Sequence, residues 1–119
     1  MKGKLALVTG STGGIGLGIA RTLASRGANL VLNGFGDAAD IEVRYDGADL
    51  AKPDDIAAMM SRLEQAGGVD ILVNNAGIQH VAPIEDFPAD RWHAVIALNL
   101  SAVFFTMHHA IPGMRRKNW

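Results

Sequence analysis

The segment LALVTGSTGGIG, residues 5–16, is where the architecture of this chain begins to show. Its first five residues form a largely apolar run that stops at Gly10, which is typical of a strand buried on both faces of a parallel sheet. Residues 14–26 then place apolar side chains at helical spacing, and Gly27 follows as a helix stop. The sequence therefore predicts a strand, a glycine-rich turn and a helix in direct succession.

The alternation of apolar strands with helices continues along the 119 residues. Further strands are expected at residues 28–33, 43–49 and 69–74, and further helices at residues 53–65 and 88–115. This alternation is typical of the α/β class. We expect one domain, residues 1–119, with a Rossmann-like doubly wound parallel sheet. Only the first half of that fold, about four strands with flanking helices, is expected here.

Two features of this layout are unusual. Residues 34–42 alone separate the second and third strands, whereas a parallel crossover with its helix usually needs about a dozen residues or more. Either the connecting helix is shortened, or a segment is absent, or the third strand is not parallel. The chain also ends shortly after the helix at residues 88–115, where a dinucleotide-binding fold usually continues into a second half.

The glycine-rich turn has the chemistry of a phosphate-binding loop. Glycines permit positive φ angles and let the backbone approach a pyrophosphate closely. The helix behind the turn offers unpaired N–H groups and the positive end of its dipole to an anion. A plain structural turn is the alternative, but the position between a strand and a helix favours a dinucleotide site. The expected cofactor contacts are Gly10, Ser11, Thr12, Gly14, Ile15 and Gly16.

Composition excludes several classes of function. Apolar residues make up 49% of the chain and charged residues 19%, which is typical of a globular protein. A formal net charge of −1 leaves no footprint for nucleic acid, and no apolar run approaches the roughly 20 residues of a membrane span. There are no cysteines, and the histidines share no metal-ligand spacing with carboxylates. We expect a cytoplasmic protein without a metal site, a nucleic-acid partner or a membrane.

The spacing of the glycines carries more information than their number. Residues 9–16 read TGSTGGIG, and residues 74–77 read NNAG at the end of the predicted fourth strand. Asp49 follows the third strand, and Asn99 lies within the long helix. These features, in this order, resemble the short-chain dehydrogenase/reductase family over the whole chain. The resemblance implies a Rossmann-like fold and a bound nicotinamide cofactor.

The resemblance also assigns roles at the carboxyl ends of the later strands. It implies that Asp49 and Leu50 lie near the adenine, and that Asn99 supports a proton relay. It implies further that the segment Asn75, Ala76 and Gly77 contacts the ribose and nicotinamide side of the cofactor. These three residues also have a structural role open to them, bracing the fourth strand, and both roles can hold together.

The end of the second strand decides between the two nicotinamide cofactors. NADP carries an additional phosphate that calls for a Lys or Arg at this point. Residues 33–37 read NGFGD, without a basic residue, and the negative charge of Asp37 would repel that phosphate. We therefore expect NAD. Asn33 can hydrogen-bond a ribose hydroxyl, and Phe35 can cover the adenosine unless its ring packs on a neighbouring helix.

Residues 32–37, 77–80 and 97–104 resemble one branch of the family in particular, whose members oxidise 3-hydroxybutyrate to acetoacetate with NAD. This implies a small-molecule substrate with a carboxylate. By the same resemblance, Gln79 contacts that carboxylate, because a side-chain amide can donate to it without adding charge. Without the resemblance, Gln79 would be read as an ordinary loop glutamine.

The catalytic Ser, Tyr and Lys of the family have no counterpart in this sequence. The one tyrosine, Tyr45, lies in the third strand and has Asp49 rather than Lys four residues later. We therefore expect a chain that stops before the catalytic segment and does not turn over by itself, whereas a full-length parent would be a homo-oligomeric dehydrogenase. The alternatives are a non-catalytic protein that binds NAD or pairs with subunits, and a fragment of another short-chain alcohol dehydrogenase.

Overall fold

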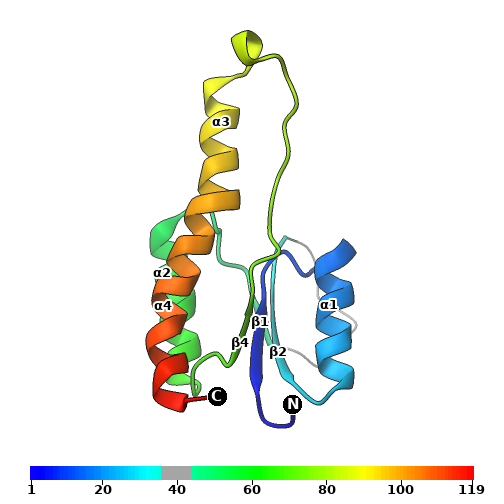
Figure 1. Ribbon diagram of the computed structural model, residues 1–119, viewed down its shortest axis with the longest axis vertical. Coiled ribbons are helices and arrows are strands. Elements are labelled where there is room, and N and C mark those ends of the chain that lie inside the picture. The colour runs from blue at the N-terminus through cyan, green and yellow to red at the C-terminus, as the bar shows by residue number, and fades with distance from the viewer. Residues whose placement is uncertain (36–43) are drawn as a thin grey trace.

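The computed structural model describes residues 1–35 and 44–119, and strands and helices alternate along them (Figure 1). The strands are β1 (Leu5–Val8), β2 (Asn29–Asn33), β3 (Arg44–Asp46) and β4 (Ile71–Val73). The helices are α1 (Gly14–Ser25), α2 (Pro53–Gln65), α3 (Ala89–Ile96) and α4 (Ala102–Lys117). A short 3-10 turn, η1 (Ile84–Asp86), precedes α3, and a π-helical segment, η2 (Ala97–Ser101), joins α3 to α4.

The strands form one four-stranded parallel sheet in the order β3-β2-β1-β4. This arrangement confirms the predicted Rossmann-like α/β fold. Because β3 runs parallel to β2, with Leu32 opposite Tyr45, the alternative of a third strand that is not parallel is wrong. The predicted start of that strand at Val43, most of the short link, and Asp37 lie outside the described residues.

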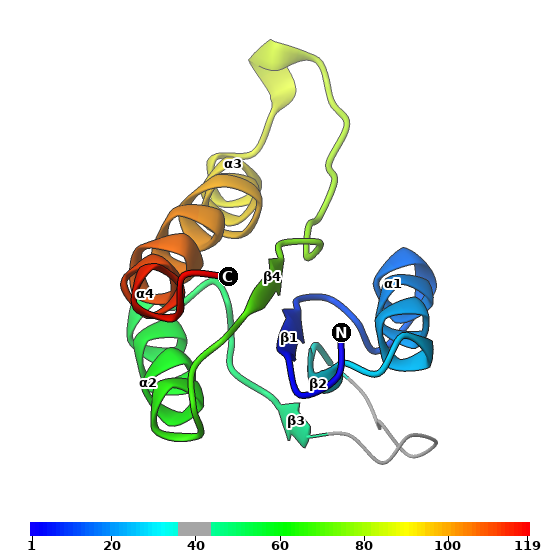
Figure 2. The same cartoon turned by 60° about the horizontal axis from the view of Figure 1, so that its bottom comes forward.

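Helices cover both faces of the sheet (Figure 2). Successive side chains of a strand point to opposite faces, and the two apolar clusters of the core follow this rule. On one face, Leu7 and Val31 pack with Ile56 and Met59 of α2. On the other face, the cluster formed by Ala6, Val8, Ala20, Leu30 and Leu32 packs beside α1. β1 and β2 are the two central strands, and apolar side chains cover both of their faces.

The segments α3, η2 and α4 make one long helix that rises beyond the end of the sheet (Figure 1). This run, Ala89–Lys117, spans 29 residues and contains an 18-residue stretch with a mean hydropathy of 1.6, so by length and composition alone it could cross a membrane. The segment has no continuous apolar run of that length, so the sequence alone did not indicate it. Core helices of soluble proteins pass the same test. Here Ala102, Thr106 and Ala110 are buried, whereas Leu100 and Phe104 are exposed.

Candidate cofactor site

The glycine-rich turn adopts the backbone geometry that its sequence requires. Gly10 and Gly14 have φ angles of +60° and +54°, a region that side chains rarely adopt. A Cβ on Gly10 would lie 2.8 Å from the Cα of Ala76. A Cβ on Gly16 would overlap the carbonyl oxygen of Gly10 and lie 2.5 Å from Nδ2 of Asn75. The turn and the end of β4 therefore touch at the level of the backbone.

Thr9 and Asn75 bind these two segments together. The buried Thr9 hydroxyl accepts the backbone N–H groups of Asn75 and Ala76, both at 3.0 Å, and donates to the carbonyl of Val73 at 3.3 Å. In return, Nδ2 of Asn75 donates to the carbonyls of Thr9 and Gly10, both at 3.0 Å. The bracing role considered for Asn75 is thus present. Thr9 was missed as a site residue, although its position between the apolar run and Gly10 was a signal for it.

The residues of the turn itself divide into inward-facing and outward-facing groups. The Ser11 hydroxyl is fully buried and donates to the carbonyl of Val8 at 2.6 Å, so it serves the fold. The Thr12 hydroxyl donates to the carbonyl of Phe35 at 2.9 Å. Ile15, in the first turn of α1, is 79% exposed. The outer surface of the turn therefore consists of backbone, Thr12 and Ile15.

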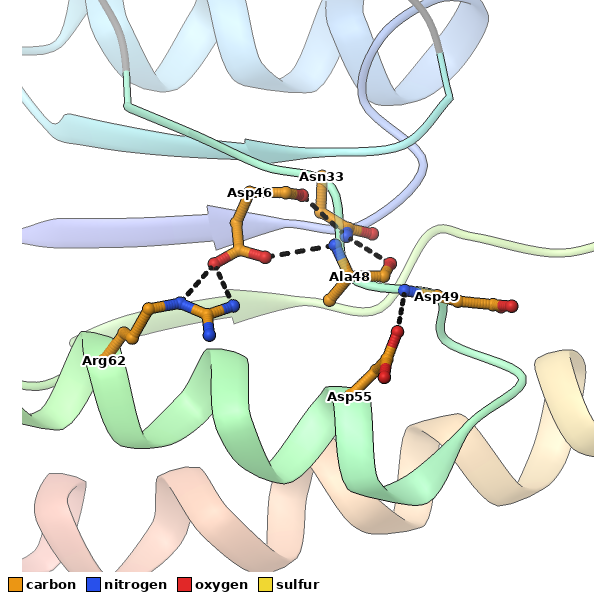
Figure 3. Close-up of polar contacts among 6 residues, drawn as sticks. All are labelled: Asn33, Asp46, Ala48, Asp49, Asp55 and Arg62. Atoms are coloured by element: carbon orange, nitrogen blue, oxygen red, sulfur yellow. Dashed lines mark hydrogen bonds and ion pairs between the residues drawn. The ribbon is translucent and has the colours of Figure 1, made fainter.

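The carboxyl end of β2 is held by a polar network that extends into the segment after β3 (Figure 3). Nδ2 of Asn33 donates to the carbonyls of Asp46 at 2.9 Å and Ala48 at 3.0 Å. The side chain is 1% exposed, so the ribose contact considered for Asn33 does not fit this geometry. Both of its N–H groups stabilise the junction between strands instead.

The same network fixes the loop that carries Asp49 (Figure 3). Asp46 accepts the Ala48 N–H at 3.0 Å and the Arg62 guanidinium at 2.8 Å, which ties the loop to α2. Asp55 accepts the backbone N–H of Asp49 at 3.1 Å. The Asp49 carboxylate itself accepts the Ala51 N–H at 2.9 Å.

The two residues that follow this network differ in exposure. Leu50 is 6% exposed and belongs to the apolar core beside α2. Its side chain therefore supports the loop from within. Asp49 is half-buried, so it is the member of this pair that keeps some access to a ligand at the edge of the sheet.

Asn99 occupies the middle of the π-helical segment η2, and π-helical bulges of this kind are frequent at functional sites. Its Oδ1 accepts the N–H of Ile78 at 2.9 Å, and its Nδ2 donates to the carbonyl of Ile78 at 2.8 Å. A Cβ on Gly77 would lie 3.3 Å from Oδ1 of Asn99. The structure thus brings Asn99 against the NNAG segment.

A second contact, which the sequence did not predict, joins the long helix to the segment after β4. The buried Thr106 of α4 donates to Oδ1 of Asn74 at 2.8 Å. Asn74 is the first residue of the NNAG segment. Together with Asn99, this contact holds both ends of that segment to the long helix.

Gln79 and Phe35 have exposed side chains. Gln79 follows Ile78 on the extended segment beyond β4, and Phe35 is 83% exposed after the end of β2. His80, next to Gln79, packs edge-on against Phe87 at 5.1 Å between ring centroids, so its ring contacts another part of the protein. Among the described residues, no group of three or more His, Asp or Glu side chains is arranged to hold a metal ion.

A hollow among the described residues lies at the opposite end of the strands. Its volume is about 450 Å³, and it is lined by residues at the amino ends of the strands, including Asn29, Arg44 and Asp70. Parallel-sheet folds bind ligands beyond the carboxyl ends of their strands, so we place the functional site at the glycine-rich turn.

Asp70 has a structural role at the amino ends of the strands. It accepts the Leu5 N–H at 2.8 Å and Lys117 at 3.0 Å, and Lys4 lies 3.9 Å away. Burial acts to raise the pKa of Asp70, but the Leu5 N–H, Lys117 and Lys4 outweigh it and hold that pKa below its ordinary value. Asp70 therefore joins the start of β1 to the end of α4 as a carboxylate.

These features define a nucleotide-binding α/β domain of the short-chain dehydrogenase type. The sequence profile of the short chain dehydrogenases matches residues 4–119, and the chain belongs to this family. It is similar to the D-beta-hydroxybutyrate dehydrogenase of Cupriavidus necator, with 55% identity over 131 aligned positions. Those positions include all of this chain and 51% of the relative. The enzyme of the same name from Rhizobium meliloti is 51% identical, and the match covers 98% of this chain and 50% of that protein.

Solved structures agree with the family assignment. A metagenomic short-chain oxidoreductase in complex with NADP superposes with a TM-score of 0.88 at 35% identity, covering 96% of this chain and 57% of that one. The chain spans about half the length of the curated relatives it matches. The Cupriavidus alignment also has 12 more positions than the chain has residues. The alignment therefore places some positions of the relative opposite gaps in this chain.

Proposed function

We propose that this chain is the NAD-binding half of an oxidoreductase that oxidises D-3-hydroxybutyrate to acetoacetate by hydride transfer. The observation that carries the proposal is the glycine-rich turn, which follows β1 and opens α1 with positive φ at Gly10 and Gly14. The name shared by the Cupriavidus and Rhizobium relatives supports the substrate.

The residues of the turn fit a pyrophosphate. A Cβ added at Gly13 or Gly14 would meet no atom within 4 Å, so the outer side of the turn is open backbone. Gly13 is the N-cap of α1, and no side chain caps the helix there. The first N–H groups of α1 can therefore bind an anion, helped by the helix dipole.

We propose NAD rather than NADP as the cofactor. Neither the turn at residues 9–16 nor the end of β2 at residues 33–35 carries a Lys or Arg that could bind an additional phosphate. The NADP bound to the metagenomic relative is a property of that protein. In our proposal the exposed Phe35 ring covers the adenosine, and Asp49 lies near the adenine.

The bound nicotinamide would accept the hydride, and the residues of this chain would position the reactants. The NNAG segment, held by Thr9 and Asn99, would face the nicotinamide side. Gln79 is exposed and would donate its side-chain amide to the substrate carboxylate. The hydroxyl proton of the alcohol must pass to a base. We propose that no residue of this chain is that base, because the Tyr45 hydroxyl donates to the carbonyl of Gly34 and has no Lys four residues on.

One observation favours a second function, the pairing of subunits. The long helix exposes a row of large apolar side chains, formed by Trp92, Leu100, Phe104, Met107 and Ile111. The spacing of three or four residues from Leu100 to Ile111 places these side chains on one side of the helix, and large exposed apolar surfaces mark interaction sites. In our proposal the parent enzyme is a homo-oligomer. This chain alone would then be able to pair with other subunits without catalysis.

The native gene product provides the test of this function. Its intact mass and its NADH formation from D-3-hydroxybutyrate are measured on the same purified sample, with L-3-hydroxybutyrate as the control. A mass about twice 12.6 kDa with D-specific activity is the expected result for a dehydrogenase parent. A product of 12.6 kDa that forms NADH would refute the assignment of this chain as a half without the base. A product twice as large that is inactive on D-3-hydroxybutyrate would refute the substrate.

A further inference from the structure

Two side-chain hydroxyls hold successive carbonyls of the short turn that follows β2. Thr12, in the glycine-rich turn, donates to the carbonyl of Phe35 at 2.9 Å. Tyr45, in β3, donates to the carbonyl of Gly34 at 2.5 Å. The backbone of residues 34–35 is therefore joined on one side to the phosphate-binding turn and on the other side to the edge strand.

The local sequence permits both contacts at close range. A Cβ on Gly34 would lie 2.6 Å from Oγ1 of Thr12, so any other residue at position 34 would displace that hydroxyl. A Cβ on Gly47 would lie 3.3 Å from the hydroxyl oxygen of Tyr45, so the phenol ring packs over a glycine. In both cases a glycine gives the hydroxyl the space it needs to reach its carbonyl.

The turn held in this way presents an aromatic ring to solvent. Phe35 is 83% exposed, at the carboxyl end of the sheet where a parallel fold binds its ligand. A ring on a mobile loop loses conformational entropy when it stacks on a ligand, whereas a ring on a fixed backbone loses less of it. We propose that Tyr45 is a positioning residue for the adenosine half of the cofactor. With Thr12, it fixes the backbone that carries the Phe35 ring. This inference rests on the proposed nicotinamide cofactor at the glycine-rich turn.

The inference gives Tyr45 a task other than catalysis. Its hydroxyl is a donor to a backbone carbonyl, and it acts through Phe35 rather than on a reacting atom. The same arrangement restricts the Thr12 hydroxyl to one role toward a ligand. The Thr12 proton is directed to the carbonyl of Phe35, so its hydroxyl faces an incoming ligand as an acceptor.

A double-mutant cycle with ADP-ribose as the probe tests the inference. ADP-ribose contains the adenosine and pyrophosphate but cannot accept a hydride, so binding is measured by calorimetry without any reaction. Loss of one such hydrogen bond in Tyr45→Phe is expected to weaken ADP-ribose by about fivefold. In the Phe35→Leu background, Tyr45→Phe is expected to have no further effect, because the ring that it positions has been removed.

Two further variants separate positioning from general stability. Ser25→Ala removes a hydroxyl that donates to the carbonyl of Thr22 at 2.9 Å, far along α1 from the turn, and should bind ADP-ribose like the wild type. Thr12→Val removes the other hydroxyl and should weaken binding to a similar extent as Tyr45→Phe. Faster amide exchange at Phe35 in Tyr45→Phe is the expected ligand-free signature.

The outcomes are distinct. A Tyr45→Phe variant that binds ADP-ribose like the wild type overturns the inference and leaves the proposed function intact. Additive losses in Tyr45→Phe and Phe35→Leu overturn it as well, since they show that Tyr45 does not act through the ring. If the folded wild-type chain fails to bind ADP-ribose, the proposed cofactor site is wrong and the inference falls with it.

Discussion

The Thr9 hydroxyl offers a sharp test of how the glycine-rich turn is joined to β4. Thr9→Val keeps the shape of the side chain and removes three hydrogen bonds, those to Val73, Asn75 and Ala76. Thr9 is 2% exposed, so water cannot replace the lost partners. At about 1 kcal/mol for each bond, the free energy of unfolding should fall by about 3 kcal/mol. That is a large part of the roughly 6–18 kcal/mol expected for a chain of this length.

The assay is urea unfolding followed by circular dichroism, with Thr22→Val as the matched control. Thr22 lies on the exposed surface of α1, where its hydroxyl donates to the carbonyl of Gly18 at 2.9 Å. Thr22→Val is therefore the same chemical change at an exposed position. The control should change stability by less than about 0.5 kcal/mol. Equal stabilities of the two variants would refute the reasoning, because they would show that the buried Thr9 network contributes nothing.

Three further predictions concern other parts of the chain. Gly16→Ala should abolish folding or cofactor binding, because its Cβ would overlap the carbonyl of Gly10. Gly18→Ala places its Cβ in open space and should stabilise α1 by up to about 1 kcal/mol, and thermal unfolding of the two variants measures this difference in stability. Because the pKa of Asp70 is lowered in the folded state, its carboxylate stabilises the fold above about pH 4, and this stabilisation should be lost as the pH falls through the pKa of the folded state. In Asp70→Asn, the free energy of unfolding should not show this loss when it is measured against pH. Asn99→Ala should speed amide exchange at Ile78 about tenfold, and an unchanged rate would contradict the pinning of that backbone.

Short-range patterns in the sequence were sufficient to predict the elements. The apolar run before Gly10 and the helical spacing after Gly14 correspond to β1 and α1, because strand and helix periodicity are local properties. The predicted strand at residues 43–49 was too long: the described β3 ends at Asp46, where its backbone carbonyl accepts Nδ2 of Asn33. The chain then turns toward α2 instead of extending the sheet.

Contacts between residues far apart in sequence could not be predicted in this way. The Thr9–Ala76 and Thr106–Asn74 hydrogen bonds join residues that are 67 and 32 positions apart, and no local pattern encodes them. The π-helical segment around Asn99 was also missed. The resemblance to the family placed Asn99 in the site, and the structure adds that it holds the backbone of Ile78.

Binding of NAD by the 119-residue chain is the most direct test of the account, with NADP titrated under the same ionic conditions in a calorimeter. The account predicts saturable binding of one NAD per chain and at least tenfold weaker binding of NADP, because neither the turn nor residues 33–35 carry a basic side chain. A chain that unfolds cooperatively yet binds no NAD, or that binds NADP more tightly, would contradict the proposed site.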